Sequence, residues 1–280
     1  MTVLITGVYG FLGSHLAKKL CEKHTVIGLY HSDVKSIPGD TVNVYNDLEL
    51  IQSIPDIIIL CHAKVSSGNY KVQNDLLFNS NVSFTEKVIN KFPFTKIVYI
   101  SSVSIFDNNV ILISENSINK PENGYAISKF WGENIVLQNP KNYVIRLSSL
   151  YGTGMKENTL IPNYCDQAIK KKTIQVWGSG SRLQNYIHVD DAINLIEKII
   201  DYKLNINFPI LGVSNKEYSN NEVAKIISDL TNSKIEYINQ DNSLSFRYKN
   251  KLTQNALNWH SKIDLKEGIK QYLEWKKKQY

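Results

Sequence analysis

VLITGVYGFLG, residues 3–13, decides the fold, because a short apolar run leads into three glycines and then into a helical pattern. Gly7, Gly10 and Gly13 would allow a tight turn and a close approach of the backbone to a ligand. Free N–H groups and the helix dipole favour a pyrophosphate at such a helix start. The spacing is GxxGxxG rather than GxGxxG, but the strand–turn–helix context indicates dinucleotide binding. A purely structural turn is the alternative.

Outward from this turn, strand and helix patterns alternate to about residue 150. We expect strands at Thr25–Tyr30, Val42–Tyr45, Ile57–Cys61, Lys96–Ser101 and Tyr143–Leu147, and helices near 71–91 and 124–138. Apolar strands with little polar alternation favour a parallel sheet covered on both faces, and right-handed crossovers favour a doubly wound order. The sequence therefore predicts an α/β fold with a Rossmann-type doubly wound parallel sheet.

After residue 150 the expected elements become shorter, with a helix to about 171, a strand at Asn185–His188 and a helix at 189–201. Further strands are expected near 208–212 and 234–238, with helices near 219–231 and from Leu265. We predict that residues 1–150 with 174–202 form an NAD(P)-binding Rossmann domain. Residues 151–173 with 203–280 would form a smaller C-terminal substrate-binding lobe.

The composition, with 42% hydrophobic and 21% charged residues, is that of an ordinary globular protein. The longest uninterrupted apolar stretch, Ile57–Cys61, is far shorter than the roughly 20 residues of a membrane span. The first residues have a strand pattern and lack the features of a signal peptide, so we expect a cytoplasmic protein without membrane partners.

The cysteines, the histidines and the net charge argue against a disulfide framework, a metal site and nucleic-acid binding. Cys21, Cys61 and Cys165 are odd in number and far apart, which argues against a disulfide framework or a cysteine-based zinc site. The histidines lack suitably spaced partners, so no metal site is predicted. The net charge of +6 comes from scattered lysines, with 32 Lys and Arg against 26 Asp and Glu, and does not favour nucleic acid as a partner.

The end of the second strand bears on the choice of cofactor. A carboxylate usually holds the adenosine ribose there, but the position falls near Tyr30, His31 and Ser32, none of which is acidic. Asp33 comes a residue or two late, and the polar groups could instead accept a 2′-phosphate, so both NADP and NAD stay open. Asp47, after the third strand, could bond the adenine amino group or simply cap the next helix.

A second motif, YAISK, places Tyr125 and Lys129 four residues apart, hence on one face of a helix. The preceding strand ends in Ser101-Ser102, so these groups should converge at the carboxyl edge of the sheet, where such folds bind ligands. A nearby ammonium favours the phenolate and should lower the pKa of Tyr125 from its ordinary value of about 10. Tyr125 could then exchange a proton with a sugar hydroxyl or carbonyl while a cofactor carries the hydride.

Further motifs extend over nearly the whole chain. They are TGVYGFLG from Thr6, Asp47-Leu48, Asn81-Val82, SSVSIF from Ser101, YAISK from Tyr125, RLSSLYG from Arg146, LIPN from Leu160, GSGSRLQNYIHVDD from Gly178 and ALNW from Ala256. In this order and spacing the chain resembles the extended short-chain dehydrogenase/reductases, the NAD-dependent epimerase/dehydratase family. Members of that family act mostly on nucleotide-linked sugars.

The resemblance implies a role for individual residues. Tyr125 would be the catalytic acid or base, Lys129 its partner and Ser102 the catalytic hydroxyl. The implied cofactor contacts are Gly7, Tyr9, Gly10, Phe11, Leu12, Gly13, Tyr30, His31, Ser32, Asp47, Leu48, Ala63, Asn81 and Lys129. The implied substrate contacts are Ser104, Ser149, Arg182 and Arg247.

Departures from the family pattern bear on the reaction. Val103-Ser104 stands where sugar-nucleotide 4,6-dehydratases have an Asp-Glu pair, so no carboxylate is available there to drive loss of water. Ser149 stands where many members have an asparagine that touches the sugar or phosphate. Gln184-Asn185 replaces the usual Arg-Asp, so Arg182 or Arg247 would have to reach the phosphates.

We therefore expect an NAD(P)-dependent epimerase or reductase acting on a nucleotide-diphosphate sugar, with hydride transfer at a sugar carbon, C4, and Tyr125 as proton donor or acceptor. The motif set favours a 4-epimerase, whereas the missing ribose-binding acid favours an NADPH-consuming 4-ketoreductase. The alternatives are a reductase of a non-nucleotide carbonyl compound and a non-catalytic dinucleotide-binding protein. The resemblance also implies a homodimer formed through helices that flank the sheet.

Overall fold

The computed structural model describes residues 1–31, 42–65, 72–155, 159–201 and 206–279, and these fall into two compact units. Unit 1 comprises Met1–Asp107, Ser117–Leu147 and Leu195–Leu211. Unit 2 comprises Asn108–Asn116, Ser148–Asn194 and Gly212–Tyr280. The predicted division into a cofactor domain and a substrate lobe concerns function and stays a prediction.

Within the described residues, unit 1 is built on a seven-stranded sheet with the order β11-β7-β5-β4-β1-β2-β3. Its strands are β1 (Thr2–Thr6), β2 (Thr25–Leu29), β3 (Val42–Tyr45), β4 (Ile57–Leu60), β5 (Lys96–Ser102), β7 (Tyr143–Leu147) and β11 (Ile210–Gly212). Neighbouring strands from β3 to β7 run parallel. The chain winds outward from β1 in both directions, which confirms the predicted Rossmann-type doubly wound sheet.

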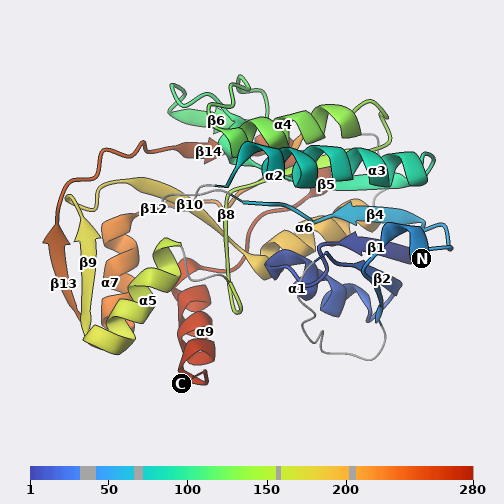
Figure 1. Cartoon of the computed structure of the whole chain (residues 1–280). Coiled ribbons are helices and arrows are strands. Elements are labelled where there is room, and N and C mark those ends of the chain that lie inside the picture. The colour runs from blue at the N-terminus through green and yellow to red at the C-terminus, as the bar shows by residue number, and fades with distance from the viewer. Residues whose placement is uncertain (32–41, 66–71, 156–158, 202–205, 280) are drawn as a thin grey trace. The chain divides into compact units, whose positions relative to one another are not determined.

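Helices cover this sheet on both faces, with α3 and α4 on one face and α1 on the other (Figure 1). The bounds are α1 (Phe11–Leu20), α2 (Asn74–Phe78), α3 (Phe84–Lys91), α4 (Gly124–Val136) and α6 (Val189–Asp201), whose second half belongs to unit 1. Because both faces are covered, the central strands are rich in apolar residues, and all four residues of β4 are apolar and buried.

One predicted helix differs from the expectation. The pattern at 71–91 predicted a single helix, but a π-helical turn at Asn79–Ser83 separates α2 from α3. A π turn rotates the residues that follow it relative to a regular helix, and such turns are frequent at functional sites. Here it carries Asn81, whose side chain is fully buried.

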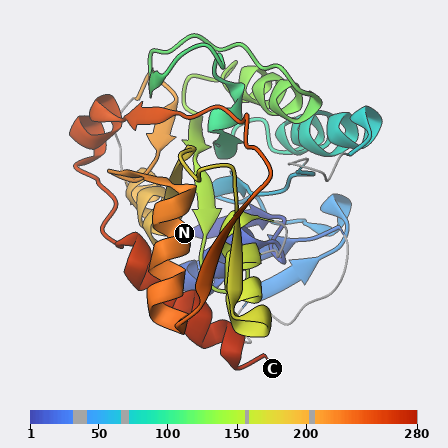
Figure 2. The same cartoon turned by 90° about the vertical axis from the view of Figure 1, so that its left-hand side faces the viewer.

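Unit 2 combines short sheets with helices. Its strands are β6 (Leu112–Ser114), β8 (Ser149–Tyr151), β9 (Thr173–Trp177), β10 (Leu183–His188), β12 (Glu217–Ser219), β13 (Lys234–Ile238) and β14 (Arg247–Lys249). Its helices are α5 (Leu160–Lys171), the first half of α6, α7 (Asn220–Thr231), α8 (Lys251–Leu257) and α9 (Leu265–Lys277). Helix α7 packs against α5 and α9 (Figure 2). Ser219 and Glu222 start α7 with a capping box.

A buried ion pair fixes α4 against the sheet of unit 1. Arg146 in β7 donates two hydrogen bonds to the Glu133 carboxylate, from Nε at 3.1 Å and from Nη2 at 2.8 Å. The two side chains are only 3% and 1% exposed. The guanidinium carbon of Arg146 also lies 4.9 Å from the ring centroid of Phe106. Because α4 carries Tyr125 and Lys129, this pair helps to set their positions.

We predict that Arg146→Leu lowers the free energy of unfolding by about 3–5 kcal/mol, because it leaves the Glu133 carboxylate buried without its partner. The double variant Arg146→Leu/Glu133→Leu should recover most of the loss. Urea denaturation measures both effects. Lys19→Ala is the control, since it breaks an exposed pair with Glu22 and should cost about 0–1 kcal/mol. A single variant as stable as the wild type would contradict the prediction.

Candidate functional site

The glycine turn lies at the carboxyl end of β1. Gly7 adopts a φ of +67°, in the left-handed region, and its N–H donates to the Leu29 carbonyl at 2.8 Å. A Cβ at Gly13 would clash with the Gly7 carbonyl oxygen, so α1 approaches the turn more closely than a side chain would allow. Helix α1 starts at Phe11 without a side-chain cap from the described residues. These features form a cradle of amide groups that suits a diphosphate.

Residues on both sides of the turn were also predicted as cofactor contacts. The Tyr9 ring lies against the Tyr30 ring, with centroids 4.9 Å apart at an angle of 59°. Tyr30 follows β2 directly and His31 is exposed, whereas Ser32 lies outside the described residues. Leu12 is buried, so only its backbone can face a ligand.

Asp47 caps a short 3₁₀ helix at Leu48–Leu50, because its Oδ1 accepts the Glu49 N–H at 3.0 Å. Asp47 thus has the capping role, one of the two roles that the sequence left open. The contact of Asp47 with adenine stays a prediction. Leu48 is buried. Ala63 is exposed in the loop that follows β4.

That loop lies against the glycine turn, since a Cβ at Gly7 would come within 2.9 Å of the His62 backbone. The His62 ring bridges two threonines, with Nδ1 2.6 Å from Thr6 Oγ1 and Nε2 3.1 Å from Thr85 Oγ1. Burial lowers the pKa of His62 to about 3, so the ring is neutral at ordinary pH. The sequence analysis did not single out His62. Its place just after β4, at the edge where ligands bind, was the available signal.

Asn81 connects the same loop to α4. Its Oδ1 accepts the Lys64 N–H at 2.8 Å, and its Nδ2 donates to the Lys64 carbonyl at 3.0 Å. Nδ2 also donates to Ser128 Oγ at 2.9 Å, and that hydroxyl donates to the Tyr125 carbonyl at 2.8 Å. Asn81 therefore positions the backbone around the site, and its direct contact with a cofactor stays a prediction.

Ser102 and Tyr125 meet at the carboxyl edge of the sheet. Ser102 ends β5, Tyr125 lies in the first turn of α4, and their hydroxyls are hydrogen-bonded. Burial raises the pKa of Tyr125 to about 12, and the bond from Ser102 acts against this rise. We expected Lys129 to lower the pKa of Tyr125, and for the protein without a ligand this expectation is wrong. Burial is the largest cause acting on Tyr125, and the hydrogen bond with Ser102 offsets it only in part.

The Lys129 ammonium is buried and has no hydrogen-bond partner within the described residues. Nζ lies 4.0 Å from the ring centroid of Tyr99. Burial lowers the pKa of Lys129 to about 7, although Glu133 and Cys61 both act to raise it. A buried donor of this kind fits a ligand that brings hydroxyl oxygens to it, as the ribose of a nicotinamide nucleotide would. With the glycine cradle, the residues present thus fit a dinucleotide.

The predicted substrate contacts are divided between the units. In unit 1, Ser104 donates its N–H to Ser102 Oγ at 3.1 Å, and its own hydroxyl is buried without a partner among the described residues. In unit 2, Ser149 starts β8 and is exposed, and Arg182 Nε donates to the Leu244 carbonyl at 3.4 Å. Arg247 starts β14 and is exposed. The roles of all four in binding a substrate stay predictions.

Asn185, which stands where the family usually has aspartate, is built into unit 2. Its Oδ1 accepts from Ser148 Oγ at 2.7 Å and from the Ser214 N–H at 2.9 Å. Its Nδ2 donates to the Ser214 carbonyl at 2.9 Å. The neighbouring Gln184 donates to Asn220 at 2.8 Å. Both amides are therefore engaged within unit 2.

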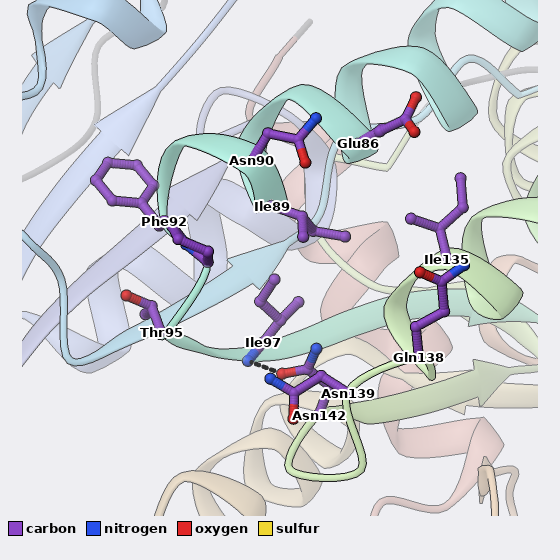
Figure 3. Close-up of a pocket in the computed structure, with 11 residues that line it drawn as sticks. Glu86, Ile89, Asn90, Phe92, Thr95, Ile97, Ile135, Gln138, Asn139 and Asn142 are labelled. Atoms are coloured by element: carbon purple, nitrogen blue, oxygen red, sulfur yellow. Dashed lines mark hydrogen bonds between the residues drawn. The ribbon is translucent and has the colours of Figure 1, made fainter.

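Two hollows in the described structure include none of the predicted site residues. One, of about 230 Å³, lies where β5 begins, between the last turns of α3 and α4, which is the opposite edge of the sheet from Ser102 (Figure 3). The Ile97 N–H donates to Asn142 Oδ1 across its floor at 2.9 Å. The other lies in unit 2 beside Trp259.

The described residues lack two kinds of feature. None of the helices they form combines the length and apolar character needed to cross a membrane. They also contain no group of three or more His, Cys, Asp or Glu side chains arranged to hold a metal ion.

Residues 3–208 match the NAD dependent epimerase/dehydratase family. A putative UDP-glucose 4-epimerase of Methanocaldococcus jannaschii is 26% identical over 98% of each chain. The human dTDP-D-glucose 4,6-dehydratase is 23% identical over 98% of this chain and 89% of its own. The structure of MoeE5 in complex with UDP-glucuronic acid and NAD is similar over the full length of both chains, with a TM-score of 0.89 and 19% identity.

The chain belongs to the NAD dependent epimerase/dehydratase family, because the match spans well over half of its length. This confirms the predicted family and the predicted class of cofactor, a nicotinamide dinucleotide. The relatives include both epimerases and dehydratases, so membership defines an enzyme family and not a single reaction.

The buried state of Lys129 gives a prediction for stability against pH. Its pKa is about 7 in the folded protein and 10.5 when unperturbed. Between these values the unfolded chain binds the additional proton, so this residue's contribution to stability rises with pH. Relative to Lys129→Met, the wild type should gain up to about 1.4 kcal/mol per pH unit from pH 7 to 9.

Urea unfolding of both proteins at several pH values measures this difference. Groups whose shifts do not involve Lys129, such as Tyr151 and Tyr186, cancel in the comparison. Parallel curves for wild type and Lys129→Met would show that Lys129 is not buried in its uncharged form.

Proposed function

We propose that this protein is an NAD(P)-dependent 4-epimerase of a nucleotide-diphosphate sugar, with Tyr125 as the proton acceptor and donor. The observation that carries the proposal is the hydrogen bond between Ser102, at the end of β5, and Tyr125 on α4. The same helix holds Lys129, whose buried ammonium has no hydrogen-bond partner among the described residues. These groups lie at the edge of the sheet where the glycine turn would cradle a diphosphate.

Each side chain would have a distinct task. Ser102 would hold the oxygen on C4 of the sugar by a hydrogen bond, and Tyr125 would take the proton from that hydroxyl. Lys129 would hold the ribose hydroxyls of the dinucleotide and, as a cation, stabilise the Tyr125 phenolate. A nicotinamide held there would supply the chemistry of hydride acceptance and return. Return to the opposite face of the sugar would complete an epimerisation.

Dehydration is disfavoured by the residues after Ser102. Loss of water from a sugar needs a general acid and a base beside the reacting carbons, and Val103 and Ser104 offer no carboxylate. The names of the similar proteins point to UDP or dTDP sugars as the substrates to examine first.

A second candidate is a 4-ketoreductase that consumes NADPH. It is favoured by Tyr30, which stands at the end of β2 where NAD-specific folds usually carry a ribose-binding carboxylate. A reductase releases its oxidised cofactor after each turnover, whereas an epimerase can keep the same NAD bound. Cofactor retained after gel filtration therefore distinguishes the two.

We expect Tyr125→Phe to lower kcat at least about 100-fold while leaving NADH affinity unchanged, because only proton transfer is lost. Purified protein is incubated with NAD and UDP-glucose or UDP-glucuronic acid, and the products are resolved by NMR. Tyr143→Phe in β7 is the matched control and should retain activity.

The products separate the outcomes of this test. A 4-epimer supports the proposal, whereas a 4-keto-6-deoxy product would identify a dehydratase. NADPH-dependent loss of a 4-keto sugar would identify the reductase. The proposal fails if no UDP or dTDP sugar is converted and neither nucleotide raises the melting temperature.

We also propose that two copies associate through α2 and α4. Phe78, Ile127 and Trp131 are 42%, 48% and 51% exposed, and the Phe78 and Trp131 rings pack edge-to-face with centroids 5.3 Å apart. Ile127 lies one turn before Trp131 on α4. Exposed apolar groups gathered in this way are typical of an interface.

Trp131→Glu should convert a homodimer into a monomer, because the carboxylate would have to be buried in the apolar contact. Light scattering after size-exclusion chromatography measures the mass. Phe94→Glu is the control, since Phe94 is 97% exposed in the turn between α3 and β5, outside this cluster. A monomeric wild type, or a Trp131→Glu dimer, would contradict this mode of association.

A further inference from the structure

Tyr99 lies at the centre of unit 1 and was not singled out from the sequence. It is the fourth residue of β5, and its side chain is fully buried. Its hydroxyl lies 3.5 Å from the Asn81 carbonyl oxygen in the π turn. A Cβ at Gly132 would clash with the same hydroxyl, so α4 packs directly on the ring. The ring is therefore fixed in place by three separate elements.

The face of this ring is occupied by the amino group of Lys129. Lys129 Nζ lies 4.0 Å from the ring centroid, well within the roughly 6 Å over which an aromatic face attracts an ammonium. The same Nζ is buried and has no hydrogen-bond partner in the part of the chain that the structure describes. The contact with the ring thus takes the place that a hydrogen bond would normally have.

The other titratable groups that face Lys129 are less able to hold it. From α4, the Glu133 carboxylate attracts the ammonium, but both of its oxygens accept hydrogen bonds from Arg146. From the end of β4, burial raises the pKa of the Cys61 thiol to about 12, and His62 is neutral. Tyr125 is a neutral phenol at ordinary pH. The aromatic face is the remaining close partner.

We propose that Tyr99 is a positioning residue whose ring face seats the Lys129 ammonium and raises the protonated fraction of this lysine until a ligand hydroxyl reaches it. Tyr99 acts only through Lys129 and touches no reacting atom. The consequence for turnover rests on the proposed function, whereas the seating of the ammonium does not. The hydroxyl of Tyr99 is not needed for this role, because the attraction comes from the ring face.

Three substitutions at position 99 separate the ring face from packing. Tyr99→Phe removes the hydroxyl and keeps the face. Tyr99→Leu removes the face. Pentafluorophenylalanine at this position keeps the shape of phenylalanine but withdraws electrons from the ring, so it weakens the attraction in a protein that packs like the Phe variant.

The readout is the pKa of Lys129, measured by NMR titration of protein carrying ¹³C-labelled lysine, with the signal assigned by Lys129→Met. We expect Tyr99→Phe to titrate like the wild type. Tyr99→Leu and the fluorinated variant should titrate about one pH unit lower, because the charged form loses the ring's attraction. The fluorinated variant decides the question if Tyr99→Leu does not fold. Equal titration in all variants, or a shift in Tyr99→Phe as large as in the other two, overturns the proposal.

Kinetics add a second readout. If a substrate is turned over, the alkaline limb of the pH profile of kcat/KM should shift to lower pH in Tyr99→Leu and in the fluorinated variant, by about one pH unit as in the titration. In Tyr99→Phe this limb should not shift. A shifted Lys129 titration in a protein that converts no nucleotide sugar would refute the proposed function and leave the role of Tyr99 standing. An unshifted Lys129 titration in an enzyme that converts a nucleotide sugar would refute the role of Tyr99 and leave the proposed function standing.

Discussion

The site depends on one costly feature, an ammonium that is buried without a hydrogen-bond partner from the described part of the chain. Taking Lys129 out of water disfavours its charged form, and the Glu133 carboxylate offsets part of this cost. In our proposal the Tyr99 ring, 4.0 Å from Nζ, does the same. Glu133 is itself held by Arg146 in a buried pair, which positions α4 on the sheet. The stability of this part of the fold and the protonation state of Lys129 are therefore set by the same few contacts.

The parallel sheet explains why these groups meet. The glycine turn follows β1, His62 follows β4 and Ser102 ends β5, so all lie at one edge although they are far apart in the chain. Hydrogen bonds then lock the arrangement, with His62 joining Thr6 to Thr85 and Asn81 joining Lys64 to Ser128. The Rossmann-type sheet brings these residues to one edge, and the hydrogen bonds between their polar groups fix their positions there.

Much of the fold and of the candidate site could be predicted from the sequence, because these parts depend on local sequence patterns. The glycine spacing, the apolar strands and the four-residue interval from Tyr125 to Lys129 are visible in short windows, and the fold and family followed from them. What depends on contacts between distant segments was missed. Tyr99 looks like an ordinary strand residue until α4 is packed on it, and the π turn is invisible in the helical pattern. The direction of the Tyr125 pKa was wrong for the same reason, because spacing reports proximity and not burial.

The central claim is that the Lys129 ammonium awaits the hydroxyls of a dinucleotide. It is tested most directly by measuring the pKa of Lys129 by NMR in the wild-type protein, first alone and then saturated with NADH. NADH is the suitable form because it lacks the positive charge of the oxidised ring. We predict a rise from about 7, since ribose oxygens and phosphate charges both favour the ammonium. An unchanged or lower pKa in the complex would contradict the account.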